Sequence, residues 1–334
     1  MISRAVEMLL SHRLGGTVIF TNSGRSGLYL ALEALKVSGS VAVSPLAPYA
    51  ALTPIVAVGL RPRFIDIDPE TLNMDPNSLL SNLDEGVSTV MAIHMAGLPV
   101  DLRRIHEALR ERRIRIVEDC CQSFGAHVDG VPVGSRGDCS VYTFHYPPVY
   151  ANGGVVKTSP QLAAAIRHLL KSLPKKGLGT AEGDLGRFEK KNRQPRTFSS
   201  ATAFNKLIFE LGLYAHYQRR ARLLYLALAQ KGLELQSDSP GRVYTKIMMK
   251  RVERVGEKIR QMRRLGVNAQ HLTGEYLLLQ PRVDRHPLFR KYATSSELPN
   301  YFEIHDSIIS IIPPVTGSVK RMAEKIAKGM GAKV

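Results

Sequence analysis

Residues 117–126 read Val-Glu-Asp-Cys-Cys-Gln-Ser-Phe-Gly-Ala, so a short apolar run ends in two carboxylates and an amide follows shortly after. The run 115–118 predicts a buried strand. Open α/β sheets bind ligands at the carboxyl ends of their strands, and these polar side chains occupy such an end. From residue types alone, Glu118 and Asp119 could bind Mg²⁺ or cap a helix, and both interpretations stay open.

On both sides of this stretch, strand-like and helical patterns take turns as far as about residue 158. Short apolar or β-branched runs bounded by turn residues predict strands, and apolar residues at helical spacing after capping residues predict helices. The predicted strands are 41–44, 63–67, 89–93 and 115–118, and the predicted helices are 26–35, 51–58, 76–83 and 102–112. This alternation is typical of an α/β fold with a mostly parallel sheet covered by helices.

The second half of the chain has a different pattern. A stretch rich in glycine, proline and basic residues, 172–199, predicts a loop. We therefore divide the chain into a large domain at 1–199 and a smaller C-terminal α+β domain at 200–334. In the smaller domain we expect helices at 201–229, 245–265 and 318–328 and a strand at 307–312.

Composition limits the class of protein. The chain has 334 residues, 44% of them hydrophobic and 22% charged, without a long apolar run, which is typical of soluble globular proteins. Charged residues interrupt the N-terminus, so we expect no signal peptide and no membrane association. Only 3 cysteines are present, too few to cross-link a chain of this size. We therefore expect a cytoplasmic protein with reduced thiols.

The net charge of +17 lies almost entirely after residue 158, because the first half is close to neutral. A basic field of this size attracts polyanions such as nucleic acid, anionic lipid or phosphorylated metabolites. It is equally compatible with a solvated basic surface. The basic residues are not interleaved with aromatic ones in the way that nucleic-acid motifs require.

Two further motifs carry candidate binding residues. The first, Asn-Ser-Gly-Arg-Ser-Gly at 22–27, opens a predicted helix, where free backbone N–H groups and the helix dipole can hold a phosphate. The second, Tyr-Thr-Phe-His at 142–145, is followed by a loop and the paired glycines at 153–154, which predicts a strand, a loop and a second strand.

Together with 117–126, these motifs resemble the DegT/StrS family of PLP-dependent sugar aminotransferases. The segments 59–68, 92–101, 298–300 and 308–316 add to the resemblance, which is close over 20–158 and poor over about 172–240. It implies the aspartate aminotransferase fold, in which 1–199 would be the domain that binds pyridoxal 5'-phosphate. It also implies a homodimer with active sites at the interface, and phosphorylated or nucleotide-linked keto sugars as substrates.

The resemblance also implies roles for individual residues. Asp119 would pair with the pyridine nitrogen of the cofactor and keep it protonated, so that the ring accepts electrons. Gln122 would hydrogen-bond the ring hydroxyl. Counting along the family motif puts Pro48 at the position of the aromatic residue that stacks on the ring. Tyr49, next to it, would take this role. A turn or helix-capping carboxylate is the alternative interpretation of Asp119.

The phosphate of the cofactor would be held by the loop that opens the first motif. Gly24, Arg25 and Ser26 match the family residues whose N–H groups bind it, and Thr143 stands where the family commonly has a serine that reaches the same phosphate. An exposed cation without a ligand is the alternative for Arg25.

One feature of the family is missing. Counting along the family motif puts the position of its Schiff-base lysine at Pro148, or at Val149 if one residue is inserted. No lysine occurs between Arg136 and Lys157. Such a lysine holds the cofactor covalently and moves the proton. The sequence therefore predicts an altered site that binds pyridoxal or pyridoxamine phosphate non-covalently.

Three consequences stay open. The protein could use pyridoxamine phosphate to dehydrate a sugar, with His145 as the base, although local packing is the favoured interpretation of His145. Lys175 or Lys176 could replace the missing lysine. The protein could also have lost catalysis and serve as a binding or regulatory protein, whose basic C-terminal half contacts a polyanion such as nucleic acid.

Overall fold

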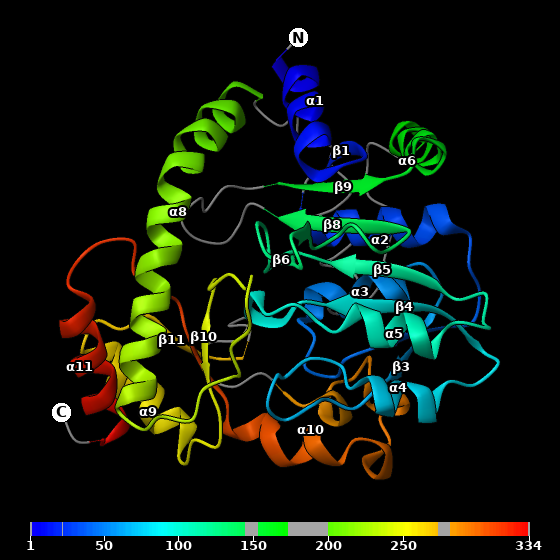
Figure 1. Cartoon of the computed structure of the whole chain (residues 1–334). Coiled ribbons are helices and arrows are strands. Elements are labelled where there is room, and N and C mark those ends of the chain that lie inside the picture. Colours follow the sequence, from blue (N-terminus) through cyan, green and yellow to red (C-terminus); the bar gives the residue numbers. More distant parts are fainter. Residues whose placement is uncertain (1, 22, 144–152, 173–199, 273–280, 333–334) are drawn as a thin grey trace.

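The computed structural model describes residues 2–21, 23–143, 153–172, 200–272 and 281–332. These residues form a seven-stranded sheet flanked by helices, beside a three-stranded sheet covered by helices (Figure 1). The α/β class with a mostly parallel main sheet is therefore confirmed. The predicted domain boundary at 199 adjoins residues outside the described ranges and stays a prediction.

The elements of the first part lie up to residue 172, and those from 24 to 119 follow the predicted alternation with ends shifted by a few residues. Their bounds are α1 Ile2–Leu14, β1 Thr17–Thr21, α2 Gly24–Leu35, β2 Ser40–Val43, α3 Tyr49–Ala57, β3 Arg61–Phe64, α4 Pro76–Asn82, β4 Val87–Ile93, α5 Leu102–Ala108, β5 Arg115–Asp119, β6 His127–Val128, β7 Val131–Pro132, β8 Cys139–Thr143, β9 Gly154–Thr158 and α6 Pro160–Ser172.

The second part begins with a long helix. Its helices and strands are α8 Ser200–Gln230, β10 Ile247–Met249, α9 Val255–Arg264, β11 Ala269–His271, α10 Pro299–Ile304, β12 Ile309–Ile311 and α11 Val319–Met330. Short 3-10 helices lie at Met95–Gly97, Val283–Arg285, Arg290–Tyr292, Ser295–Glu297 and His305–Ser307.

The main sheet has the strand order β1-β9-β8-β5-β4-β2-β3. Neighbours from β8 to β3 run parallel, whereas β9 is antiparallel to both β1 and β8. The carboxyl ends of β4, β5 and β8 therefore meet at one edge of the sheet. Figure 1 shows α4 and α5 in front of this sheet and α2 and α3 behind it.

Buried apolar side chains divide between the two faces of the main sheet. Leu28, Val117 and Val156 belong to the core on the α2 side. Parts of the second half join this core, including Val283 and Phe289. The opposite face packs against α1 at one end of the sheet and against α4 and α5 at the other.

The three-stranded sheet, in the order β10-β12-β11, corrects one prediction. The expected helix over 245–265 is wrong in its first part, where 247–249 forms β10. Ile247 pairs with Ile311 and Met249 with Ile309, so a strand far along the chain selects the extended form. The helix begins only at Val255 and buries the side chains that the helical spacing predicts, Val255, Ile259 and Met262.

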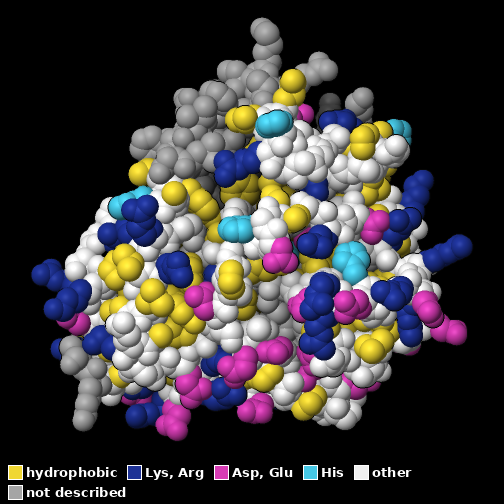
Figure 2. All heavy atoms as spheres, viewed as in Figure 1, with side chains coloured by type: hydrophobic (Ala, Val, Ile, Leu, Met, Phe, Trp, Pro, Cys, Tyr) yellow, Lys and Arg dark blue, Asp and Glu magenta, His cyan; other side chains and the backbone are white. Residues whose placement is uncertain are grey.

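The surface bears on the charge asymmetry. On the face in Figure 2, lysine and arginine side chains are spread out among acidic ones and form no continuous patch. Some are paired, such as Arg63 with Glu297 and Arg251 with Glu234. This face therefore gives no support to a polyanion-binding surface. Among the described helices, none combines the length and the apolar character needed to cross a membrane.

Candidate active site

The first motif forms a small cradle at the start of α2. Ser23 is the N-cap, and its side chain accepts a hydrogen bond from the N–H of Ser26 at 3.1 Å. A Cβ added to Gly24 would lie 2.5 Å from Sγ of Cys121 and 3.4 Å from Cβ of Thr143. The start of α2 therefore meets the ends of β5 and β8, and it brings Gly24 close to Thr143.

A second glycine forms the back of this cradle. A Cβ on Gly154 would lie 2.6 Å from the carbonyl oxygen of Tyr142 and 2.9 Å from the backbone nitrogen of Gly24. Thr143 is held nearby, because its Oγ1 donates to the carbonyl of Gly153 at 3.1 Å. Such close backbone packing at a helix N-terminus fits an anion.

We expect Gly24→Ala to damage this cradle. The added methyl group would overlap Cys121, which costs about 1–3 kcal/mol of stability in tightly packed sites. It would also narrow the space for a phosphate, so retention of pyridoxamine phosphate should fall at least about tenfold, since 1.4 kcal/mol corresponds to tenfold. Equilibrium dialysis and urea unfolding measure the two effects.

Gly256→Ala is the matched control. That glycine lies in α9, and its added Cβ would meet only the end of Arg260 at 3.7 Å. Alanine there should leave cofactor retention unchanged and raise stability by up to about 1 kcal/mol. Equal retention by the Gly24 variant and this control would contradict a phosphate site at the start of α2.

Asp119 ends β5 at the same edge of the sheet. Its side chain is buried, with 4% exposed, and Oδ1 accepts a hydrogen bond from the N–H of Cys121 at 3.0 Å. Burial raises the pKa of this carboxyl above its ordinary value. Among the described residues, no lysine or arginine forms an ion pair with it, while hydrogen bonds from Cys121 and the attraction of His94 offset part of this rise in pKa. A buried carboxylate of this kind fits a protonated ring nitrogen, which supplies the positive partner.

Gln122 lies between two loops and is also buried. Its Oε1 accepts the N–H of Ala96 at 3.1 Å, and its carbonyl accepts Oγ1 of Thr245 at 2.9 Å. The amide is thus held rigidly, close in the chain to Asp119, which suits the predicted contact with a ring hydroxyl. That contact stays a prediction.

Two further residues were predicted to bind the cofactor, Arg25 and Tyr49. Arg25 is half-buried on the first turn of α2. Tyr49 is buried, donates its hydroxyl to the carbonyl of Pro281 at 2.6 Å, and lies with its ring centre 4.2 Å from that of His286. Its described contacts are therefore with the second half of the chain, and its stacking on a cofactor stays a prediction.

Several predictions fall on residues that the structure does not describe. His145, Pro148 and Val149 lie in 144–152, and Lys175 and Lys176 lie in 173–199. The predicted loop at 172–199 is outside the described residues from 173 onward.

Glu118 faces the opposite side of the sheet from Asp119 and has a different task. Its two carboxylate oxygens accept hydrogen bonds at 2.6–2.7 Å from the N–H groups of Gly134, Arg136 and Gly137. Nε2 of His94 lies 3.2 Å from Oε2 of Glu118. Burial raises the pKa of Glu118, but the hydrogen bonds from His94 and the backbone outweigh burial, and the net pKa is lowered.

This arrangement argues against a metal site at 118–119. The two carboxylates point to opposite faces, so they cannot share one ion. His94, Glu118 and Cys120 do lie within 4.8 Å of one another. However, the oxygens of Glu118 already have four partners, and burial raises the pKa of the Cys120 thiol far above normal. Metals bind the thiolate, which is disfavoured here.

Lys157 lies on the Glu118 face as well. The register pairs Glu118 with Ser140 and Ser140 with Lys157, so the three side chains share one side of the sheet. The Nζ of Lys157 donates to the carbonyl of Gly134 at 2.7 Å. Its amine is therefore directed away from the face of Asp119.

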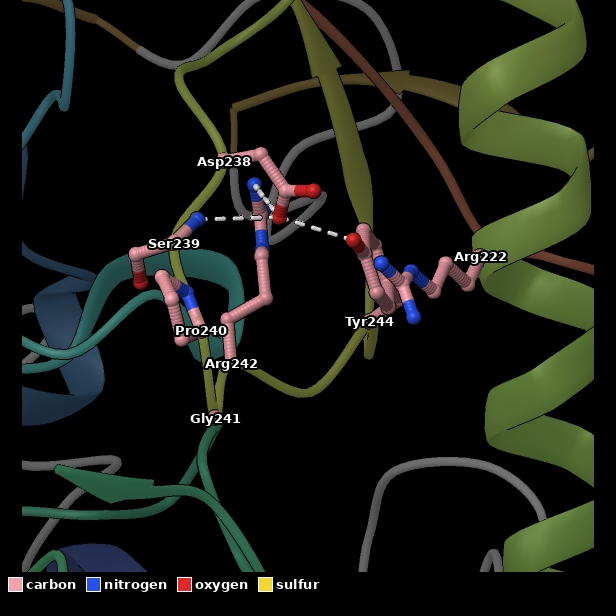
Figure 3. A pocket seen from close by; sticks show the side chains of 7 residues that line it. All are labelled: Arg222, Asp238, Ser239, Pro240, Gly241, Arg242 and Tyr244. Atoms are coloured by element: carbon pink, nitrogen blue, oxygen red, sulfur yellow. Dashed lines mark hydrogen bonds and ion pairs between the residues drawn. The ribbon is translucent and has the colours of Figure 1, made fainter. Parts of the chain in front are cut away.

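A pocket that the sequence analysis did not identify opens between α8 and the segment 238–244 (Figure 3). Its volume is about 450 Å³. Asp238 accepts hydrogen bonds from the hydroxyl of Tyr244 at 2.7 Å and from the N–H of Ser239 at 3.0 Å. The guanidinium of Arg242 lies over the ring of Tyr244 at 4.7 Å. The sequence analysis found no motif at 238–244, and Arg222 joins this segment only through the tertiary structure.

Comparison with known proteins agrees with this geometry. The model of the DegT/DnrJ/EryC1/StrS aminotransferase family matches residues 9–316. L-glutamine:2-deoxy-scyllo-inosose aminotransferase of Streptoalloteichus tenebrarius is 30% identical over 66% of this chain and 54% of its own length. GDP-perosamine synthase of Escherichia coli O157:H7 is 32% identical over 41% of this chain and 39% of its own length. The chain thus spans about half or less of these relatives.

Solved structures show the same fold over nearly the whole chain. The sugar aminotransferase CalS13 of Micromonospora echinospora has a TM-score of 0.78 at 24% identity and covers 98% of this chain and 92% of its own. The E. coli GDP-4-keto-6-deoxy-D-mannose-3-dehydratase with bound hydrated PLP has a TM-score of 0.78 at 18% identity, covering 99% and 92%. Because the family model spans almost the full sequence, this chain belongs to the DegT/DnrJ/EryC1/StrS aminotransferase family.

Proposed function

We propose that this protein binds pyridoxal or pyridoxamine 5'-phosphate and acts on a keto sugar linked to a nucleotide or phosphate. The observation that carries the proposal is the buried Asp119 carboxylate beside the cradle formed by Gly24 and Thr143. These features match the two ends of the cofactor, a basic ring nitrogen and a phosphate. The names of the related sugar aminotransferases and of the related dehydratase support the substrate class.

Each residue of the candidate site has its own proposed role in binding the cofactor. Asp119 would hold a proton at the ring nitrogen of a bound cofactor, which would make the ring an electron sink for the substrate carbon. The N–H groups of Gly24 and Arg25 at the start of α2, with Thr143, would hold the phosphate, because the N–H of Ser26 already donates to the Ser23 side chain. Gln122 orients the ring through its hydroxyl. Burial of the Asp119 carboxyl excludes water from this contact, which strengthens it.

The absence of lysine at the position that matches Pro148 bears on the type of reaction. No lysine occurs between Arg136 and Lys157, and Lys157 faces the other side of the sheet. The proposal therefore includes dehydration with pyridoxamine phosphate as well as transamination. His145 is the proposed base for the dehydration, as the sequence predicts.

The proposal includes a homodimer in the cytoplasm. Exposed apolar side chains on α1 and α8, such as Met8 at 68% and Leu223 at 50%, support an interface between two copies. The described cysteines are free thiols, which supports a reducing compartment.

Two assays test the proposed function. Both cofactor forms should bind in equilibrium dialysis. With pyridoxamine phosphate and a nucleotide-linked 4-keto-6-deoxyhexose, mass spectrometry should then show either replacement of the ketone oxygen by an amino group or loss of a hydroxyl group from the sugar. The first product indicates transamination and the second dehydration. Failure to bind either cofactor form would refute the proposal.

A further inference from the structure

The pocket between α8 and the segment 238–244 is separate from the candidate cofactor site. None of the residues that line it belongs to the motifs around Gly24, Asp119 and Thr143. It adjoins the β6–β7 hairpin instead, because the N–H of His127 donates to the carbonyl of Gly241 at 2.9 Å. Its volume of about 450 Å³ accommodates a small metabolite. The ligand of this pocket must therefore be inferred from the side chains of the pocket itself.

Asp238 supplies a carboxylate oxygen that the protein itself does not use. Its Oδ1 accepts hydrogen bonds from the hydroxyl of Tyr244 at 2.7 Å and from the N–H of Ser239 at 3.0 Å, and it lies 4.0 Å from Nη1 of Arg242. Its Oδ2 has no hydrogen-bond partner among the residues that the structure describes, and Figure 3 shows this oxygen on the side of α8. Because three groups hold Oδ1, the direction of Oδ2 is fixed, and Oδ2 can accept a hydrogen bond from a ligand.

Arg222 supplies a positive charge from the other side of the pocket. Its side chain extends from α8 toward Tyr244 in Figure 3. Burial raises the pKa of the Tyr244 hydroxyl, and the positive charge of Arg222 opposes this rise, so the guanidinium acts on that hydroxyl at short range. In the described part of the chain, no carboxylate lies within ion-pair distance of Arg222. Its planar set of N–H donors can therefore bind an anion.

Arg242 holds the wall of the pocket in place. Its side chain is 1% exposed, and it donates from Nη1 to the carbonyl of Ser237 at 2.7 Å and from Nη2 to Oε1 of Gln236 at 2.8 Å. Its guanidinium lies over the ring of Tyr244. These contacts fix Tyr244 and, through the Tyr244 hydroxyl, Asp238. The pocket is thus ordered before a ligand binds, which lowers the entropic cost of binding.

The two opposite charges determine the class of ligand. A simple anion bound to Arg222 would lie near the free oxygen of Asp238, and a simple cation bound to Asp238 would lie near Arg222, so a like charge opposes each of them. A molecule that carries both an ammonium group and a carboxylate satisfies both side chains. We propose that this pocket binds a free α-amino acid, whose ammonium group donates to Oδ2 of Asp238 and whose carboxylate accepts hydrogen bonds from Arg222.

Isothermal titration calorimetry of the full-length protein tests this proposal. The probes are L-glutamate and L-glutamine, which carry both charged groups, and inorganic phosphate and methylammonium, which carry one kind of charge. We expect at least one amino acid to bind at one site per chain, with the same affinity whether or not pyridoxamine phosphate is present. No binding of either amino acid at millimolar concentration would overturn the proposal. Phosphate binding as tight as that of the amino acid, or loss of amino-acid binding when pyridoxamine phosphate is added, would also overturn it.

Two variants locate the amino acid within the protein. Arg222→Gln and Asp238→Asn each remove one charge, and each should weaken amino-acid binding at least about tenfold, as expected when a hydrogen bond between charged groups is lost. The matched controls are Arg219→Gln, exposed on α8 but outside the pocket, and Asp129→Asn, exposed in the turn between β6 and β7. Both controls should keep the affinity of the parent. Parent affinity in either pocket variant would overturn the proposal, and circular dichroism spectra check that each variant is folded.

Discussion

Asp119→Asn is expected to weaken retention of pyridoxamine phosphate roughly 10- to 100-fold, because a hydrogen bond to a charged group contributes about 1.5–3 kcal/mol. The asparagine oxygen can still accept the N–H of Cys121, so the local backbone should persist. Only the charged contact with the ring nitrogen is lost. Equilibrium dialysis of the parent and the variant measures the change.

The same variant should be at least as stable as the parent without cofactor. Burial raises the pKa of Asp119 in the folded state, so the folded protein binds a proton more readily than the unfolded chain. The parent should therefore become more stable as the pH falls from the raised folded pKa toward the unfolded pKa of about 3.9. This gain in stability should be absent at pH values above the folded pKa. Asparagine does not titrate, so this pH dependence should disappear from the variant.

Asp101→Asn is the control for both measurements. Asp101 is the exposed N-cap of α5, and its side chain accepts the N–H of Arg104 at 3.1 Å. Asparagine caps helices equally well, so retention and stability should both stay at the parent values. Unchanged cofactor retention in Asp119→Asn would show that this carboxylate does not contact the ring nitrogen.

Glu118→Ala is expected to cause the largest loss of stability, about 3–5 kcal/mol, because it removes one partner of a buried charged network. The N–H groups of Gly134, Arg136 and Gly137 would lose their acceptor, and so would His94. Urea unfolding at pH 7 measures the difference in the free energy of unfolding. Glu107→Gln, on the exposed side of α5, should change stability by less than about 0.5 kcal/mol.

The contribution of Glu118 to the free energy of unfolding should also depend on pH. Its pKa is lowered in the folded state, so its contribution is present above the unfolded pKa of about 4.3 and is lost as the pH falls through the folded value. The stability difference between parent and variant should therefore shrink in acid. A variant as stable as the parent at pH 7, or a parent that added Mg²⁺ stabilises while the variant is unaffected, would contradict a purely structural carboxylate.

Local sequence patterns determined a large part of this protein. The alternation of strands and helices through residue 158 predicted the parallel sheet, and polar capping residues predicted the start of several helices, as Ser23 shows for α2 and Asp101 for α5. The spacing of apolar residues along a helix or strand and the capping of a helix depend on residues a few positions apart. Both can therefore be predicted from one short segment at a time.

Only the tertiary structure decided the features that depend on distant partners. The segment 245–265 has an apolar spacing that suits a helix, yet pairing with β12 makes 247–249 a strand. Glu118 and Asp119 are neighbours in the sequence, and their separate tasks follow from which face of the sheet each occupies and from the Gly134–Gly137 loop that reaches Glu118. The contact of Thr245 with the carbonyl of Gln122 follows from the packing of the two halves of the chain against each other. Such contacts join residues far apart in the chain, and a pattern confined to one segment carries no information about them.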